Sequence, residues 1–139
     1  MTYAYRPMAL DDYEEVYALW RQTIPGALDD VDSRESVCRY LSQNPEQSFL
    51  CHEHGAVIGT ILCGNDGRRA YIHHLAVLPE HRRRGIASEL VRRALAAQKA
   101  RGIDKCNLFA FNENDPGSAF WRHEGFAFRD DLRLMSKWI

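Results

Sequence analysis

The sequence has 139 residues, with 18 Lys and Arg, 19 Asp and Glu, and a formal net charge of −1 at pH 7. This length suits one domain, residues 1–139, and leaves little room for a second. Because the chain is almost neutral, it has no overall field to draw it to nucleic acid or to an anionic membrane, and no apolar run is long enough to span a bilayer.

The four cysteines show neither C-x-x-C nor zinc-ligand spacing. Each lies in an apolar run, so we expect reduced thiols in the core and no metal site. Reduced thiols and the lack of a signal-peptide pattern indicate a cytoplasmic protein.

The first third of the chain predicts one strand and two helices. Ala4 to Met8 alternates weakly, and Asp11 or Asp12 is placed to cap the helix that follows it. The apolar face of this helix comprises Tyr13, Val16, Tyr17 and Trp20. After an acidic loop, Asp32 with Glu35 three residues later has the spacing of a capping box, which predicts a second helix through about Leu41.

The middle of the chain predicts hairpins. Ser48 to His52 and Val57 to Cys63 read as strands joined at His54-Gly55, and Asn65-Asp66-Gly67 leads into a strand from Arg69 to Leu78. A long helix from Ile86 follows, with Gly102 as its C-terminal glycine. Lys105 to Phe111 is the next strand, and the helix between makes it parallel to the earlier one.

The last part predicts a loop from Asn112 to Ser118 and a short helix that Gly125 ends. Phe126 to Arg129 and Leu132 to Trp138 are expected to be final strands.

The turn between the central strand and the long helix has the features of an anion site. Gly85 lets the backbone approach a ligand closely, and the first N–H groups of the helix favour an anion. Arg82, Arg83 and Arg84 add positive charge beside these donors. This local basic patch suits a phosphate or pyrophosphate; the alternative is a solvated turn.

Arg82-x-x-Gly85-x-Ala87, after a strand that ends Val77-x-Pro79, resembles the acyl-CoA signature of GCN5-related N-acetyltransferases (the GNAT family). The resemblance covers essentially the whole chain and implies an α/β (α+β) fold with a mostly antiparallel sheet and splayed central parallel strands. It implies acetyl-CoA as the acyl donor. The residues it assigns to the donor are the edge Leu75, Ala76 and Val77, the turn Arg82, Arg83, Arg84 and Gly85, and the helix start Ile86 and Ala87.

A second motif, Asn114-x-x-x-x-Ala119-Phe120-Trp121 followed by Gly125-Phe126, is similar to the downstream box of the family. It implies Asn114 and Trp121 near the pantetheine arm, although the spacing from Asn to Ala is wider than is usual there. Many members carry Tyr where this chain has Trp121, and that hydroxyl protonates the departing thiolate. Trp offers only an indole N–H donor, so Trp121 either shapes the acyl pocket or is part of the core.

Acetyl transfer to an amine needs a group that accepts a proton near pH 7, and His is the residue with a suitable pKa. His73 and His74 are adjacent on the central strand, so we expect them to point to opposite faces. His73 lies two residues before Leu75 and resembles the strand base of arylalkylamine acetyltransferases; His74 is the second choice. A hydrogen-bonded histidine without a catalytic role is an open alternative.

In the family, the first two helices and their loop cover the acceptor. Here that segment combines Trp20, Ile24 and Leu28 with three aspartates, which suits a cationic amine; capping plus a solvated loop is the alternative. The sequence thus predicts an N-acetyltransferase in which a small-molecule or peptide amine attacks acetyl-CoA directly. The rival prediction is an inactive acyl-CoA-binding sensor. No nucleic-acid or membrane partner is expected, and the resemblance allows a homodimer.

Overall fold

The structure, a computed structural model, describes residues 2–111 and 115–139. It divides into a first unit that ends at Phe109 and a second that begins at Ala110. The prediction of a single domain stays a prediction.

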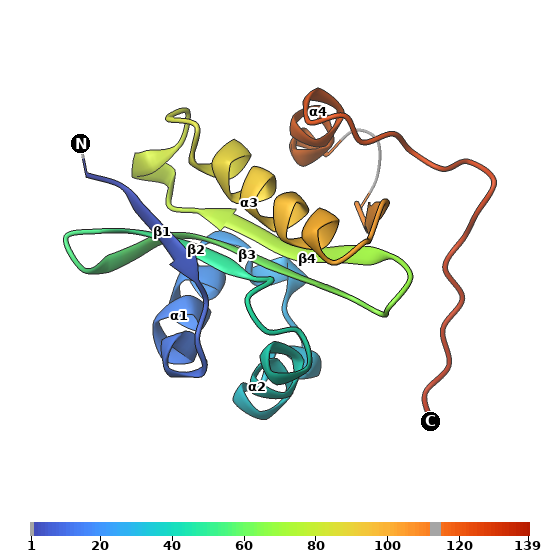
Figure 1. The fold of residues 1–139 in the computed structure, drawn as a ribbon, viewed down its shortest axis with the longest axis horizontal. Coiled ribbons are helices and arrows are strands. Elements are labelled where there is room, and N and C mark those ends of the chain that lie inside the picture. The colour runs from blue at the N-terminus through green and yellow to red at the C-terminus, as the bar shows by residue number, and fades with distance from the viewer. Residues whose placement is uncertain (1, 112–114) are drawn as a thin grey trace. The chain divides into compact units, whose positions relative to one another are not determined.

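The first unit is built on a five-stranded sheet in which the strands follow one another in chain order (Figure 1). All neighbours are antiparallel except β4 and β5, which are parallel as predicted. The strands are β1 (Ala4–Pro7), β2 (Phe49–Glu53), β3 (Ala56–Asn65), β4 (Ala70–Val77) and β5 (Cys106–Leu108). The predicted strand from Lys105 to Phe111 is therefore real but shorter.

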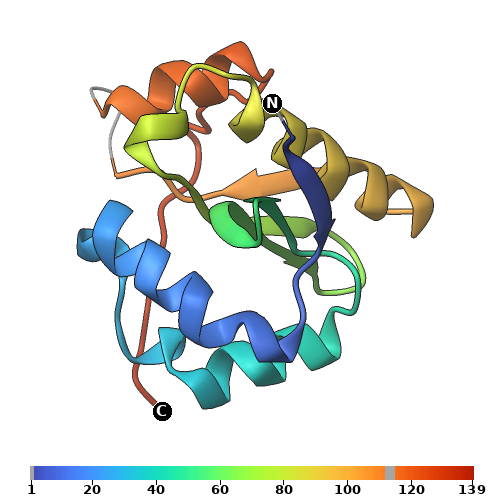
Figure 2. The same ribbon diagram turned by 90° about the vertical axis from the view of Figure 1, so that its left-hand side faces the viewer.

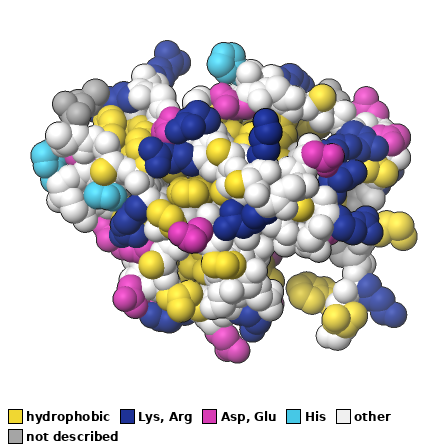
Figure 3. All heavy atoms as spheres, in the orientation of Figure 1, with side chains coloured by type: hydrophobic (Ala, Val, Ile, Leu, Met, Phe, Trp, Pro, Cys, Tyr) yellow, Lys and Arg dark blue, Asp and Glu magenta, His cyan; other side chains and the backbone are white. Residues whose placement is uncertain are grey.

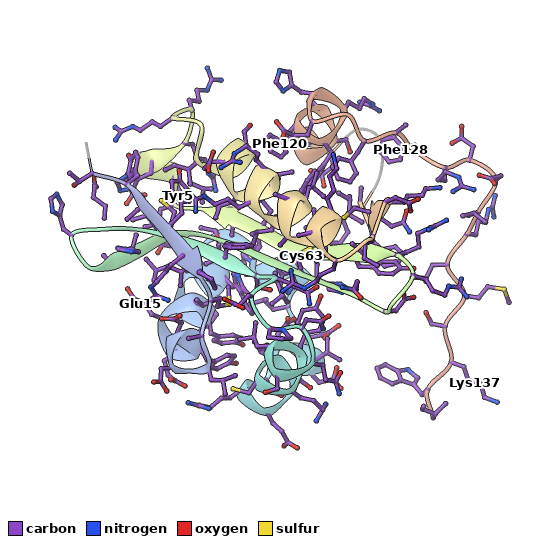
Figure 4. All side chains as sticks on the ribbon, viewed as in Figure 1. Tyr5, Glu15, Cys63, Phe120, Phe128 and Lys137 are labelled. Atoms are coloured by element: carbon purple, nitrogen blue, oxygen red, sulfur yellow. The ribbon has the colours of Figure 1, made fainter. Side chains whose placement is uncertain are left out.

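Helices cover both faces of this sheet, with α1 (Tyr13–Thr23) and α2 (Arg34–Gln43) on one face and α3 (Ile86–Ala100) on the other (Figures 1 and 2). Of the apolar face predicted for α1, Tyr13, Val16 and Trp20 are buried and Tyr17 is half-buried against the same core. Glu15 of α1, labelled in Figure 4, accepts a hydrogen bond of 2.8 Å from the Val57 amide of β3. These contacts fix α1 against the middle of the sheet.

Helix α3 approaches the opposite face closely because β3 carries Gly59 there. A Cβ atom at Gly59 would lie 3.1 Å from Ile86 Cγ2 and 3.4 Å from Leu90 Cδ1. Both side chains are buried. The absence of a side chain at Gly59 thus sets the height of the first turn of α3 above the sheet.

The ladder between β3 and β4 contains a β-bulge. Leu62 pairs with His74 and Cys63 with Ile72, so His73 is an extra residue without a partner on β3. A bulge interrupts the alternation of side chains between the two faces of a strand. For this reason the prediction that His73 and His74 point to opposite faces is wrong: both line the same pocket on the α2 side.

The start of α2 differs from the predicted capping box. Ser33 is the N-cap and accepts from the Ser36 amide at 3.2 Å. Asp32 instead ends a short 3₁₀ turn, Asp30–Asp32, and is buried. Ser and Asp are both favoured N-cap residues, and Asp32 is held instead by His74 of β4, a partner that the local pattern does not reveal.

The second unit contains α4 (Pro116–His123), which begins two residues earlier than expected. The predicted strands at Phe126 to Arg129 and Leu132 to Trp138 are wrong, because the described residues after α4 form no strand. Leu134, Met135 and Trp138 are exposed. An apolar alternating segment becomes a strand only when it has a partner edge, and none pairs with it here.

Among the described residues, no helix is long and apolar enough to cross a membrane. Figure 3 shows Lys and Arg side chains among Asp and Glu side chains on one face, so that face carries both signs of charge. This matches the near-zero net charge.

Candidate active site

The central strand β4 has an open edge beyond its short pairing with β5. That pairing is recorded only from Ala70 to Ile72, so β4 from His73 to Val77 has no strand neighbour on this side within the described chain. The Leu78 amide donates to Ile58 of β3 at 2.9 Å. Because donors alternate along an antiparallel ladder, Ala76 pairs toward Thr60, whereas Leu75 and Val77 direct their backbone N–H and C=O groups to the open edge.

At the end of this strand the chain turns into α3 through two left-handed residues. Arg83 has φ 62° and Gly85 has φ 80°, and Gly85 is the N-cap of α3. No side chain caps this helix, in contrast to α2. The amides of Ile86 and Ala87 have no acceptors within the helix and point out of its first turn. The turn therefore presents backbone donors and the positive end of the helix dipole together.

The three arginines of the turn are exposed, and two of them have contacts that fix their positions. Arg82 Nε donates to the Val77 carbonyl at 3.0 Å, which ties the turn to the last residue of β4. Arg84 donates to the Tyr3 hydroxyl at 2.8 Å. The turn residues that the sequence predicted for the anion site therefore all lie beside the first turn of α3.

A pocket of about 370 Å³ lies at the other end of the open strand segment. Its walls come from α2, from the loop between α1 and α2, and from β3 and β4. The members with polar or aromatic chemistry include Asp29, Asp32, Tyr40, His73 and His74. The loop that was predicted to cover an acceptor is therefore a wall of this pocket.

His73 lies exposed at this pocket, between two aromatic rings. Its ring centroid is 5.5 Å from that of Tyr40 and 6.4 Å from that of Tyr71. Although solvent reaches the ring, the pocket walls remove part of its hydration, and this desolvation lowers the pKa of His73 below 6.5; His74 acts in the same direction and Asp32 opposes it. This shift favours the neutral imidazole, which is the form able to accept a proton.

His74 is buried and paired, in contrast to its neighbour. Its Nε2 donates to Asp32 Oδ1 at 2.7 Å, and the two side chains are only 9% and 5% exposed. The ring meets Trp20 edge to face, with centroids 4.7 Å apart. Tyr13 donates to the Asp32 carbonyl at 2.6 Å. The hydrogen bond between Asp32 and His74, which are 42 positions apart in the sequence, therefore joins the acidic loop to strand β4 at the pocket.

Of the remaining sequence candidates, Trp121 lies in the second unit and packs edge to face with Phe120 and Phe126, at centroid distances of 5.1 and 5.2 Å. Its role near the pantetheine arm and the acyl pocket stays a prediction. Asn114 lies outside the described residues. Within the described part of the chain, no group of three or more His, Cys, Asp or Glu side chains is placed to hold a metal ion.

Several solved structures share this fold. The aminoglycoside acetyltransferase AAC(6')-Iy, solved with a bisubstrate analogue of coenzyme A, is 20% identical, with a TM-score of 0.77 over 100% of both chains. The PaiA N-acetyltransferase of Thermoplasma acidophilum, solved with coenzyme A, is 21% identical, with a TM-score of 0.78 over 95% and 94% of the two chains. A GCN5-related N-acetyltransferase of Ralstonia eutropha is 26% identical, with a TM-score of 0.75 over 99% of each.

The sequence relatives agree with the fold. A protein named acetyltransferase from Sodalis glossinidius is 31% identical over 91% of this chain and 89% of its own length. Another from Photorhabdus laumondii is 38% identical over 76% of this chain and 73% of its own length. Residues 13–126 match the acetyltransferase (GNAT) family. The chain belongs to the GNAT family of acetyltransferases.

Proposed function

We propose that this protein transfers the acetyl group of acetyl-CoA to a primary amine by direct attack in a ternary complex. The observation that carries the proposal is the order of features along one strand. β4 has the pocket histidines at His73 and His74, an open edge at Leu75 and Val77, and the anion-binding turn immediately after it. At ~3.3 Å per residue, the open edge from His73 to Val77 spans about 13 Å.

The donor fits the turn and the edge. The backbone amides at Ile86 and Ala87 and the arginines of the turn supply charge and donors for the pyrophosphate. At the open edge, the Val77 N–H supplies a donor and the Leu75 C=O an acceptor for the pantetheine amides, since the Val77 C=O already accepts from Arg82. Ala76 pairs its backbone toward β3 and its side chain is buried in the core, so we propose that it supports the two edge residues beside it.

The pocket histidine completes the chemistry. The amine attacks the thioester carbonyl carbon, a C–N bond forms, and the C–S bond breaks to release coenzyme A as its thiolate, which takes a proton from water. His73 takes the proton that the amine loses, since its lowered pKa favours the neutral ring and the ring is accessible. The Leu75 N–H, which faces the open edge two residues from His73, stabilises the negative charge that develops on the carbonyl oxygen.

The acceptor that suits the pocket is a small cationic amine. Asp29 and the buried Asp32 line it, with the Tyr40 ring as a cation–π partner. The basic member Arg39 is paired with Glu35 at 3.8 Å, which offsets its charge. We propose Asp32 and His74 as acceptor-side residues that fix the shape and charge of the pocket, and His73 as the base.

The test is an acetyl-CoA thiol-release assay against a panel of polyamines, aminoglycosides and amino-terminal peptides, with calorimetric binding of acetyl-CoA alongside. Turnover with the cationic members and not with neutral amines is the expected result. Tight binding of acetyl-CoA without turnover on the whole panel would favour the sensor prediction. Absence of binding would refute the assignment of the turn.

A further inference from the structure

The hydroxyl of Tyr3, next to the start of β1, connects two residues of the turn that precedes α3. Tyr3 Oη lies 2.9 Å from His81 Nδ1, and Arg84 donates to the same oxygen at 2.8 Å. The Tyr3 and His81 rings also meet edge to face, with centroids 5.7 Å apart and planes at 78°. Figure 1 shows the first strand beside this turn, although 78 residues separate Tyr3 from His81.

The Tyr3 oxygen can take part in both hydrogen bonds at once. A guanidinium has donors only, so the Tyr3 oxygen is the acceptor from Arg84. A phenol has one proton and two lone pairs, so the same hydroxyl still forms a hydrogen bond with His81 Nδ1. The three side chains therefore form a relay centred on the Tyr3 oxygen.

This relay and the bond from Arg82 to Val77 hold the turn at two places. A free arginine on an exposed turn samples many rotamers, and ordering it when a ligand binds weakens affinity. Arg84 is instead held in place by the amino-terminal segment. We propose that Tyr3 is a positioning residue for the pyrophosphate of coenzyme A, acting through Arg84. This inference rests on the proposed function of the turn.

The test is a calorimetric titration with coenzyme A of the full chain without an amino-terminal tag. Tyr3→Phe keeps the ring but removes both hydrogen bonds, and we expect the Kd for coenzyme A to rise about fivefold to tenfold. The matched control is Tyr5→Phe. Tyr5 points from β1 toward α3 (Figure 4), and its ring is covered by Arg93 at 4.8 Å. We expect this variant to bind within about twofold of wild type.

A double-mutant cycle separates positioning from a general loss of order. If Tyr3 acts through Arg84, Tyr3→Phe changes the Kd by less than about twofold in an Arg84→Ala background but retains its full effect in an Arg83→Ala background. A Tyr3→Phe variant that binds like wild type overturns the inference. A full effect in the Arg84→Ala background, or an Arg84→Ala variant that binds normally, does so as well.

Failure of the proposed function has a different signature. If Gly85→Glu leaves coenzyme A binding unchanged, the turn is not the site, whatever Tyr3→Phe does. If Gly85→Glu abolishes coenzyme A binding while the effects of Tyr3→Phe and Arg84→Ala on the Kd are additive, the turn is the site but Tyr3 is not a positioning residue.

Discussion

The buried contact between Asp32 and His74 gives the sharpest prediction, because both partners are almost inaccessible to water. Asp32→Ala removes the acceptor of two N–H groups: His74 Nε2 at 2.7 Å from Oδ1, and the Asp29 amide at 3.1 Å from Oδ2. Leaving a buried donor without a partner costs about 1–3 kcal/mol. The Asp29 amide lies closer to solvent, so we expect a total loss of about 3 kcal/mol in the free energy of unfolding.

Urea denaturation followed by tryptophan fluorescence measures this loss, since Trp20 lies against the His74 ring. The matched control is Asp30→Ala, an exposed aspartate of the same 3₁₀ turn, for which we expect less than about 0.5 kcal/mol. In a His74→Phe background the loss on Asp32→Ala should shrink by about 1–2 kcal/mol, since contacting residues are not additive. Equal losses for Asp32→Ala and Asp30→Ala would refute the reasoning.

Three further predictions follow from the site. Gly85→Glu puts a negative charge where the phosphates bind, so we expect coenzyme A binding to be lost in calorimetry, whereas Gly67→Glu, also at a positive φ with open space around it, should bind normally. With His73 as base and its pKa below 6.5, we expect kcat to stay constant as the pH falls to 6.5 and to decrease at lower pH, where the ring becomes protonated. In the His73→Gln variant we expect a low kcat at every pH, without this decrease. A pH–rate profile unchanged from wild type would exclude His73 as the base. Gly59→Val should lower stability by about 1–3 kcal/mol in thermal unfolding and weaken coenzyme A binding, because its Cβ meets Ile86 at 3.1 Å; normal binding would show that the height of α3 does not matter.

Features determined by nearby residues could be predicted from the sequence. The turn at His54-Gly55 has positive φ at both positions, as the residue types indicate, and the glycine at Gly85 is left-handed where the anion site needs it. The parallel pairing of β4 and β5 also follows from the long helix between them. In each case the signal lies within a few residues or in the length of one connection.

Features determined by distant residues could not be predicted. Nothing within the acidic loop indicates that Asp32 has a histidine partner 42 positions later. The bulge at His73 has no glycine or other local marker, so strict alternation was the reasonable expectation and it failed. The apolar pattern from Leu132 to Trp138 matches a strand in composition, yet a strand also needs an available edge, which no local pattern supplies.

The bulge at His73 switches the side chains that face α1 and α2 from odd-numbered to even-numbered residues of β4. Before it, the odd-numbered Tyr71 and His73 face α2, and after it the even-numbered His74 and Ala76 do. One strand therefore presents two consecutive imidazoles to one pocket and still returns to a regular ladder. Deleting His73 would restore the alternation, and the pocket would keep its buried histidine while losing its accessible one. The accessible imidazole of this pocket thus depends on a single inserted residue.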